Sequence, residues 1–220
     1  MRTSFTNIIA VSILCICTVL MQQNLFAQCP SDNNPCEWKS GTPMHLLLYK
    51  TVNGVKQSCW FTIKTCYRCC SSEYGFNIEV KVTEVIPDDP NCLTGWTFDK
   101  EYWDQVDYAA NHWGFYYVAY PDCNLSCVTN TIPPCDIVAP KLMVLYSKAA
   151  CFQYTYNTST GTSHLVPCEN SEVCKQSWSV CCDGLEIRTT KLLTYGTSVL
   201  CGPPIIIDPF ATSPCFASCY

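Results

Sequence analysis

One short motif has the residue types and spacing of a redox site. Cys66-Tyr67-Arg68-Cys69 has the C-x-x-C spacing of thiol redox catalysts, in which a lowered thiolate pKa makes disulfide exchange fast. Cys70 follows the motif directly, and no β-α-β pattern surrounds it. We therefore expect each of these sulfurs to form a structural disulfide with a distant partner.

Acidic and histidine side chains offer little further basis for catalysis. A glycosidase needs two carboxyl groups about 5 to 10 Å apart, but Asp88-Asp89-Pro90-Asn91 has the composition of a turn. Neither a Ser-His-Asp order nor a G-x-S-x-G motif is present. His45 belongs to an apolar run and is expected to pack, whereas His112 and His164 are expected at the surface. The sequence identifies no catalytic residue, metal ligand or cofactor, and it favours a protein without enzymatic activity while leaving that question open.

The segment from Thr94 to Tyr120 is the best candidate for a binding site. It contains ten aromatic residues and four acidic ones. Flat aromatic faces stack on sugar rings or fill a pocket of a protein partner, and nearby carboxylates accept hydrogen bonds from hydroxyl groups. The residues predicted to contact a glycan or an extracellular protein are Trp96, Tyr102, Trp103, Asp104, Tyr108 and Trp113.

The same segment has the pattern of a short amphipathic helix. Apolar residues recur at helical spacing from Phe98 to Trp113, and Gly114 follows as a stop. Trp103 and Tyr108 lie off this apolar stripe, so we expect both rings to be exposed and available to a ligand. The alternative is that one helical face packs the rings on a sheet while the acids face water.

Cysteine is the most informative residue type in the chain. Two of the twenty, Cys15 and Cys17, lie in the expected leader, so eighteen remain from Cys29 onward. An even number of cysteines in a chain sent to an oxidising compartment predicts disulfides rather than free thiols. A structural zinc site is not expected, because the histidines are isolated and provide no paired ligands.

The order of the cysteines predicts a duplicated unit. A Pro-Cys-acid opening followed by a Leu-Tyr strand pattern occurs at Pro35 and again at Pro134. The two halves are expected at residues 28–132 and 133–220, with residues 94–120 as an insertion in the first. The positions matched between the halves are Cys36 and Cys135, Cys59 and Cys151, Cys69-Cys70 and Cys181-Cys182, Cys92 and Cys201, and the C-x3-C pairs that begin at Cys123 and Cys215.

Each half contains nine cysteines from Cys29 onward, and this odd number has a consequence. Full pairing within one half is impossible. If all the cysteines are oxidised, at least one disulfide must therefore join the two halves or join two chains. The sequence does not identify the partners of the individual cysteines.

Strand and turn patterns predict an antiparallel sheet. Asn53-Gly54 separates two β-rich runs, residues 44–52 and 55–65, and it favours the positive φ angles of a two-residue hairpin turn. Asp183-Gly184 gives a second hairpin signal, and residues 76–82 alternate apolar with polar side chains. The expected fold class is mainly β: two tandem disulfide-rich antiparallel β repeats, with one short helical insertion in the first.

The beginning of the sequence has the features of an export signal. Arg2 precedes an apolar run at residues 8–21, and Ala27 is a small residue suited to cleavage, so residues 1–27 are expected to be removed. The apolar run is short for a bilayer span and no second one follows, so no stable membrane insertion is expected after cleavage. Thirteen basic against eighteen acidic residues, without a basic stripe, argue against nucleic acid as a partner.

These features predict a secreted protein, extracellular or periplasmic, that acts as a disulfide-stabilised binding or structural module. Its aromatic segment is expected to contact a glycan or a protein partner. Two alternatives remain open, an extracellular hydrolase acting on glycans and a subunit of an extracellular assembly. The ligand, the strand order and the oligomeric state are not determined by the sequence.

Overall fold

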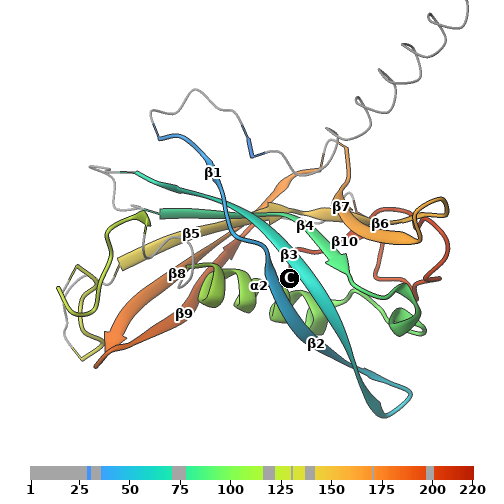
Figure 1. The fold of residues 1–220 in the computed structure, drawn as a ribbon, viewed down its shortest axis with the longest axis horizontal. Helices are drawn as coiled ribbons and strands as arrows, with labels where there is room; N and C mark the ends of the chain where they lie inside the picture. Colours follow the sequence, from blue (N-terminus) through green and yellow to red (C-terminus); the bar gives the residue numbers. More distant parts are fainter. Residues whose placement is uncertain are drawn as a thin grey trace, which may run out of the picture.

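The structure is a computed structural model that describes residues 29–30, 36–70, 78–115, 122–129, 131–136, 142–169, 171–196 and 201–220. The expected leader lies outside the described residues, and so do positions 76–77 of the predicted strand and the rings of Tyr116, Tyr117 and Tyr120. Over the described residues the fold is mainly β with a single α-helix and many disulfides (Figure 1). The expected fold class is confirmed at this level.

The described chain forms one ten-stranded sheet. Along the sheet the strands follow the order β10, β6, β7, β4, β5, β8 and β9. Strand β3 pairs with β4 as a branch of this order, and β1 and β2 both pair with β3. The paired strands are antiparallel except β4 and β5, which run parallel. The elements are β1 (Lys39–Ser40), β2 (Met44–Val52), β3 (Val55–Cys69), β4 (Ile78–Pro87), the 3-10 helix η1 (Pro90–Leu93), α2 (Lys100–Gly114), β5 (Leu142–Ala149), β6 (Cys151–Asn157), β7 (Thr162–Pro167), β8 (Val173–Asp183), β9 (Glu186–Tyr195) and β10 (Phe216–Ala217).

Both predicted hairpins are present. In the first, Val52 pairs with Val55, and Asn53 and Gly54 between them have φ angles of 50° and 78°. These angles suit the right-handed twist of the two strands. In the second hairpin the strands extend through Asp183 and Glu186, so the turn consists of residues 184–185, one position later than predicted.

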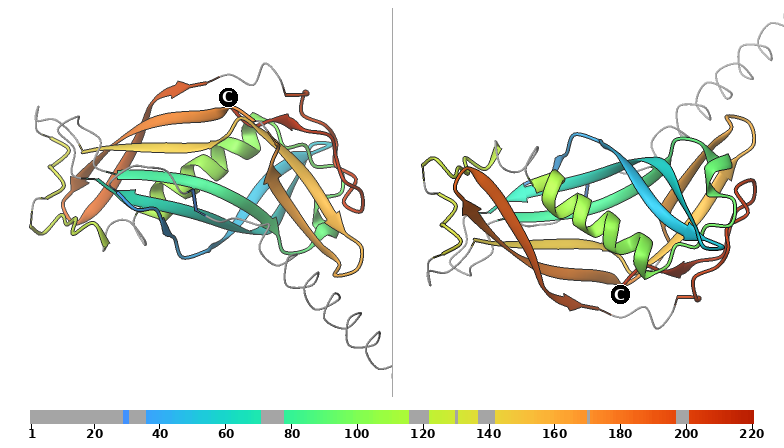
Figure 2. Two further views of the ribbon diagram at one scale, coloured as in Figure 1. Left: turned by 90° about the horizontal axis from the view of Figure 1, so that it is seen from above. Right: turned by 90° about the horizontal axis from the view of Figure 1, so that it is seen from below.

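Helix α2 lies against one face of the sheet, with the β2–β3 hairpin along one side and the β8–β9 hairpin along the other (Figure 2). The helix begins after Asp99, whose carboxylate accepts a hydrogen bond from the Glu101 N–H at 3.1 Å. An aspartate at this position satisfies an N–H group that has no partner inside the helix. The helix predicted from the apolar spacing is therefore present at residues 100–114.

The inner face of α2 forms one core with rings from both halves of the chain. The ring of Tyr102 lies 5.5 Å from that of Phe61 in β3, and the ring of Trp103 lies 4.7 Å from that of Phe152 in β6. Phe98 stacks on Phe216 at 5.5 Å. Burying a large apolar side chain stabilises the fold by roughly 2–3 kcal/mol, so these rings hold α2 firmly on the sheet.

Nine disulfides pair all eighteen cysteines from Cys29 onward. Cys66 bonds to Cys29 and Cys69 bonds to Cys123, so the C-x-x-C motif forms structural bridges, as expected. Eight bridges lie within residues 29–132 or within residues 133–220. The ninth, between Cys127 and Cys182, is the predicted bridge between the two halves.

The two halves share part of their disulfide pattern but differ in strand pairing. One bridge joins matched cysteines in both halves, Cys59–Cys92 in the first and Cys151–Cys201 in the second. Cys36 and Cys135 each bond to one cysteine of the adjacent pair, but Cys36 bonds to the second, Cys70, and Cys135 to the first, Cys181. In the first half β2 pairs with the following strand β3, whereas in the second half β5 pairs with β4 and β8, and β6 pairs with β7 and β10. The tandem repeat and its boundaries therefore stay a prediction.

Candidate functional site

Three of the six predicted contact residues are core residues. Trp96, Tyr102 and Trp103 have 0% exposure. The prediction that Trp103 is exposed is wrong, because strands contact α2 on both sides and the buried part of the helix is wider than its apolar stripe. The Trp103 ring packs on Phe152, and the Lys148 ammonium lies 4.7 Å from its centre.

The other three predicted residues, Asp104, Tyr108 and Trp113, lie on the outer side of α2. Tyr108 is 48% exposed, as predicted, and Trp113 is 36% exposed. His112 lies between the two rings; it stacks on Tyr108 at 5.2 Å and meets Trp113 edge-on at 4.9 Å. Burial and the nearby charge of Arg188 lower the pKa of His112, which favours its neutral form. Tyr108, His112 and Trp113 are called the aromatic ridge below.

A groove separates the aromatic ridge from strand β2. One hollow of about 330 Å³ lies between residues 46–49 of β2 and the outer residues of α2, including Asp104, Gln105, Tyr108 and Trp113. A second hollow of about 540 Å³ continues along residues 42–46. Both hollows are lined by Leu46 and Trp113, so they are neighbours along β2, and together they are called the β2–α2 groove.

Gln105 pairs with the open edge of β2 in the way a further strand would. The Tyr49 N–H donates to Gln105 Oε1 at 2.9 Å, and Gln105 Nε2 donates to the Tyr49 carbonyl at 2.7 Å. Outward and inward peptide groups alternate along an antiparallel edge strand, so those of Leu47 and His45 also point away from β3. Within the described chain they make no hydrogen bond. The edge of β2 is thus satisfied at Tyr49 and open at the next two outward positions.

The start of α2 is fixed to β2 by a partly buried ion pair. Lys50 Nζ lies 2.5 Å from an Asp99 carboxylate oxygen and 2.9 Å from one of Glu101. Burial acts to lower the pKa of Lys50, but hydrogen bonds and negative charge from the two acids outweigh it, so the pKa is raised. The ammonium therefore stays charged at neutral pH and ties the start of α2 to β2, next to Tyr49 in the groove lining.

A second set of polar contacts fixes the inner side of α2 to the sheet. The buried Asp107 carboxylate accepts hydrogen bonds, each of 2.6 Å, from Tyr146 Oη, Lys148 Nζ and Gln176 Nε2. Burial lowers the pKa of Lys148 more than the Asp107 charge raises it. The donors come from β5 and β8, so the rotation of the helix, and with it the position of the aromatic ridge, is set by the sheet.

The outer face of the β2–β3 hairpin holds exposed rings that sequence reasoning missed. His45 was expected to pack in the core, but it is exposed and stacks on Trp60 with the ring centres 4.6 Å apart. The reason is the strand register, which places His45, Leu47 and Tyr49 on the outer face. Leu47 weakens the alternation of apolar and polar residues in β2. The sequence signal for this outer face is therefore in β3, where Ser58, Trp60 and Thr62 are alternate residues and share one face of the strand.

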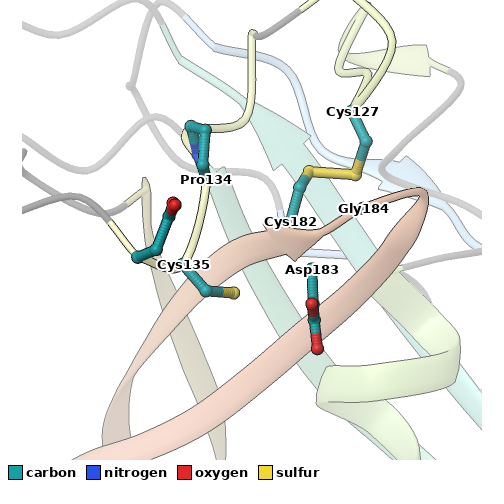
Figure 3. Close-up of a pocket in the computed structure, with 7 residues that line it drawn as sticks. Cys127, Pro134, Cys135, Cys182, Asp183 and Gly184 are labelled. Atoms are coloured by element: carbon teal, nitrogen blue, oxygen red, sulfur yellow. A yellow bond between two sulfur atoms is a disulfide. The ribbon is translucent and has the colours of Figure 1, made fainter.

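A further hollow, of about 310 Å³, lies at the bridge between the two halves (Figure 3). Its lining includes Cys127, Cys135 and Cys182, all of which are disulfide-bonded. Backbone hydrogen bonds of 2.9 Å join Cys135 N to the Cys182 carbonyl and Cys182 N to the Pro133 carbonyl. These contacts make the region a covalent and hydrogen-bonded joint, and it contains no free thiol.

Neither a metal centre nor a membrane-spanning helix is found in the parts of the chain that the structure describes. No group of three or more His, Cys, Asp or Glu side chains in these residues is placed to hold a metal ion. The described helices are too short and too polar to cross a bilayer. Comparison of the chain with protein-family models, with curated proteins and with solved structures finds no match.

Proposed function

We propose that the protein is an extracellular binding module that holds an extended segment of a partner protein in the β2–α2 groove. The observation that carries this proposal is the pairing of the Gln105 carboxamide with Tyr49. A carboxamide has the same donor and acceptor as a peptide group, so it occupies the place of one peptide group of an added strand. The next outward positions, Leu47 and His45, offer the same hydrogen bonds to a partner backbone.

The dimensions and lining of the groove support this type of ligand. Successive outward positions on a strand are about 7 Å apart, and the two hollows extend along β2 from Tyr49 past Leu47 and His45. The backbone of a partner strand supplies affinity in such a complex, and its alternate side chains supply specificity. Trp113 and Tyr108 form the opposite wall, where apolar side chains of the partner would pack.

The groove is less suited to the other activities considered. Hydrolysis of a glycan requires two carboxyl groups, and the described lining residues include one acid, Asp104, which forms an ion pair with Lys100. The open polar groups of the groove are backbone N–H and C=O groups, which match a polypeptide better than a sugar.

The disulfides support action in an oxidising, extracellular environment. Three of the nine bridges bond β3 to neighbouring segments, and one of them, Cys59–Cys92, starts from the residue of β3 that pairs with Leu48 of the groove strand. A rigid strand edge loses little conformational freedom when a partner binds. The covalent frame thus favours a preformed binding edge.

Selection of peptides from a displayed random library, with segments about as long as the nine-residue β2, tests the proposal. Peptides enriched on the oxidised protein should bind with measurable affinity by fluorescence anisotropy. The variant Leu47→Pro removes one outward N–H and is expected to weaken binding at least about tenfold. The matched control Leu47→Ala keeps that N–H and should change binding by less than about threefold.

Folding of the proline variant is checked separately. Leu47 N–H makes no bond to β3, so Leu47→Pro is expected to keep the urea unfolding midpoint close to that of Leu47→Ala. Equal peptide binding by the two variants contradicts the proposal, and so does a selection that enriches no peptide. A dimer of the unliganded protein that Leu47→Pro dissociates would instead identify a second copy of the chain as the occupant. Binding of glycans that is lost in Trp113→Ala would assign the groove to sugars and overturn the proposal.

A further inference from the structure

The outer face of the β2–β3 hairpin has a group of exposed rings centred on Trp60, a residue that does not line the groove. Trp60 is 49% exposed and Tyr49 is 40% exposed. His45, Tyr49 and Trp60 stand on the same face of the two strands, because residues opposite one another in an antiparallel pair share a face. This face of the hairpin is directed away from α2. The surface formed by His45, Tyr49 and Trp60 is called the hairpin face below.

The indole of Trp60 is held in place by a small polar network. The His45 ring lies parallel to the indole, with an angle of 14° between the planes. His45 Nε2 bonds to the Asp88 carboxylate, which also accepts a hydrogen bond from the Thr62 hydroxyl at 3.4 Å. The Asp88 N–H in turn donates to the Trp60 carbonyl at 3.0 Å. The imidazole thus covers one face of the indole and fixes its orientation, while about half of Trp60 stays exposed.

The charged groups of the hairpin face already have partners within the protein. Asp88 pairs with His45, and the Lys56 ammonium lies over the Tyr49 ring, 4.2 Å from its centre. Lys56 and Asp88 carry opposite charges, so the face as a whole offers no large excess of one charge sign to a ligand. Asp88 and Thr62 still have oxygen atoms near the surface that accept hydrogen bonds from hydroxyl groups.

We infer that the hairpin face is a binding site for neutral pyranose rings of a polysaccharide, centred on Trp60. A pyranose ring presents C–H groups on one face, which pack on the electron-rich face of an indole, and hydroxyl groups at its rim. An uncharged ligand fits a surface on which the opposite charges of Lys56 and Asp88 balance. The site borders the β2–α2 groove at His45 and Tyr49, but its central residue, Trp60, lines neither hollow, so substitution of Trp60 tests it independently of the function proposed above.

Calorimetric titration with neutral hexasaccharides tests the inference. The probes are cellohexaose, xylohexaose, laminarihexaose and mannohexaose, with a fully acidic oligogalacturonide as the charged comparison. At least one neutral probe is expected to bind with a dissociation constant of about 1 mM or tighter. Trp60→Ala should weaken that binding at least about tenfold, because a central aromatic anchor carries much of the affinity of such a site.

The chain supplies a matched control. Trp113→Ala removes an exposed tryptophan from the other surface and should leave sugar binding within about twofold of the original value. Both tryptophans are at least one-third exposed, so neither variant creates a core cavity, and near-ultraviolet circular dichroism verifies the fold. The inference is overturned if no neutral probe binds up to about 10 mM, if only the acidic probe binds, or if Trp113→Ala abolishes binding that Trp60→Ala leaves intact.

Discussion

Glu84 shows how two basic side chains hold a buried carboxylate in its charged form. Its side chain is 1% exposed, and its oxygens lie 2.6 Å from His164 Nδ1 and 2.8 Å from Lys64 Nζ. Burial alone would raise the pKa of Glu84, but hydrogen bonds and positive charge from His164 and Lys64 outweigh it. The pKa therefore lies below its ordinary value of 4.5. The three residues come from β3, β4 and β7, so the cluster ties neighbouring strands together.

This cluster predicts a loss of stability in acid. Because the pKa of Glu84 is lower in the folded than in the unfolded protein, its contribution is present above the unfolded value and is lost as the pH falls through the folded value. Urea unfolding measured from about pH 7 to about pH 3 should therefore show a steeper decline below pH 4.5 for the unchanged protein than for Glu84→Gln. The exposed Glu186→Gln is the control, and it should follow the unchanged protein. Parallel curves for Glu84→Gln and the unchanged protein would rule out this role.

At the scale of elements, the spacing of apolar residues predicted helix α2 correctly but did not predict which of its side chains are exposed. The apolar spacing identified the helix, and Asp99 and Gly114 lie at its two ends. Periodicity assigns one buried stripe, which is correct for a helix on a flat surface. In this fold the sheet contacts α2 on two sides, so Trp103 and the charged Asp107 are buried as well. The pairing of Gln105 with Tyr49 depends on which strand is an edge, and no local pattern contains that information.

The buried contacts of Asp107 predict a large loss of stability when its charge is removed. Asp107→Asn leaves the Lys148 ammonium buried without a carboxylate, and breaking a buried pair in this way costs about 3–5 kcal/mol. The neighbouring Asp104, which is 43% exposed, is the matched control. Asp104→Asn should change the free energy of unfolding by about 0.5 kcal/mol or less. Both values come from urea unfolding of the oxidised proteins.

A second substitution tests whether the stability lost in Asp107→Asn comes from the unpaired Lys148 charge or from altered packing. Adding Lys148→Met to Asp107→Asn removes the unpaired ammonium, so the double variant is expected to recover a large part of the lost stability. Equal destabilisation by Asp107→Asn and Asp104→Asn, or further loss in the double variant, would show that the buried pair does not anchor α2.

At the scale of the whole molecule, the number of cysteines predicted the disulfides better than the order of cysteines predicted the strand pairing. With all cysteines oxidised, an odd count in each half required a bridge between the halves or to another chain, and Cys127–Cys182 is a bridge between the halves. The matched order of cysteines did not predict strand pairing, because β4 and β5 meet in parallel at the centre of the sheet. Strands β6 and β7 then continue the sheet beyond β4, which separates them from β5. Such long-range strand pairing is decided by the packing of the complete core, so it cannot be predicted from the order of the cysteines along the chain.

The disulfide pattern makes a prediction about a cut chain. A site for a specific protease inserted next to Thr129 divides the chain between Cys127 and Cys135. Every bridge except Cys127–Cys182 lies on one side of this cut, so the two fragments stay joined through that bond alone. On a denaturing gel without reductant, the cut protein should migrate as one species, and reduction should release two fragments. In a variant with Cys127→Ser and Cys182→Ser, the fragments should separate without reductant, because no covalent link then connects β8 to the first half. Separation of the otherwise unchanged cut protein would show that Cys127 has a different partner, and persistent linkage in the double variant would reveal a second bridge between the halves.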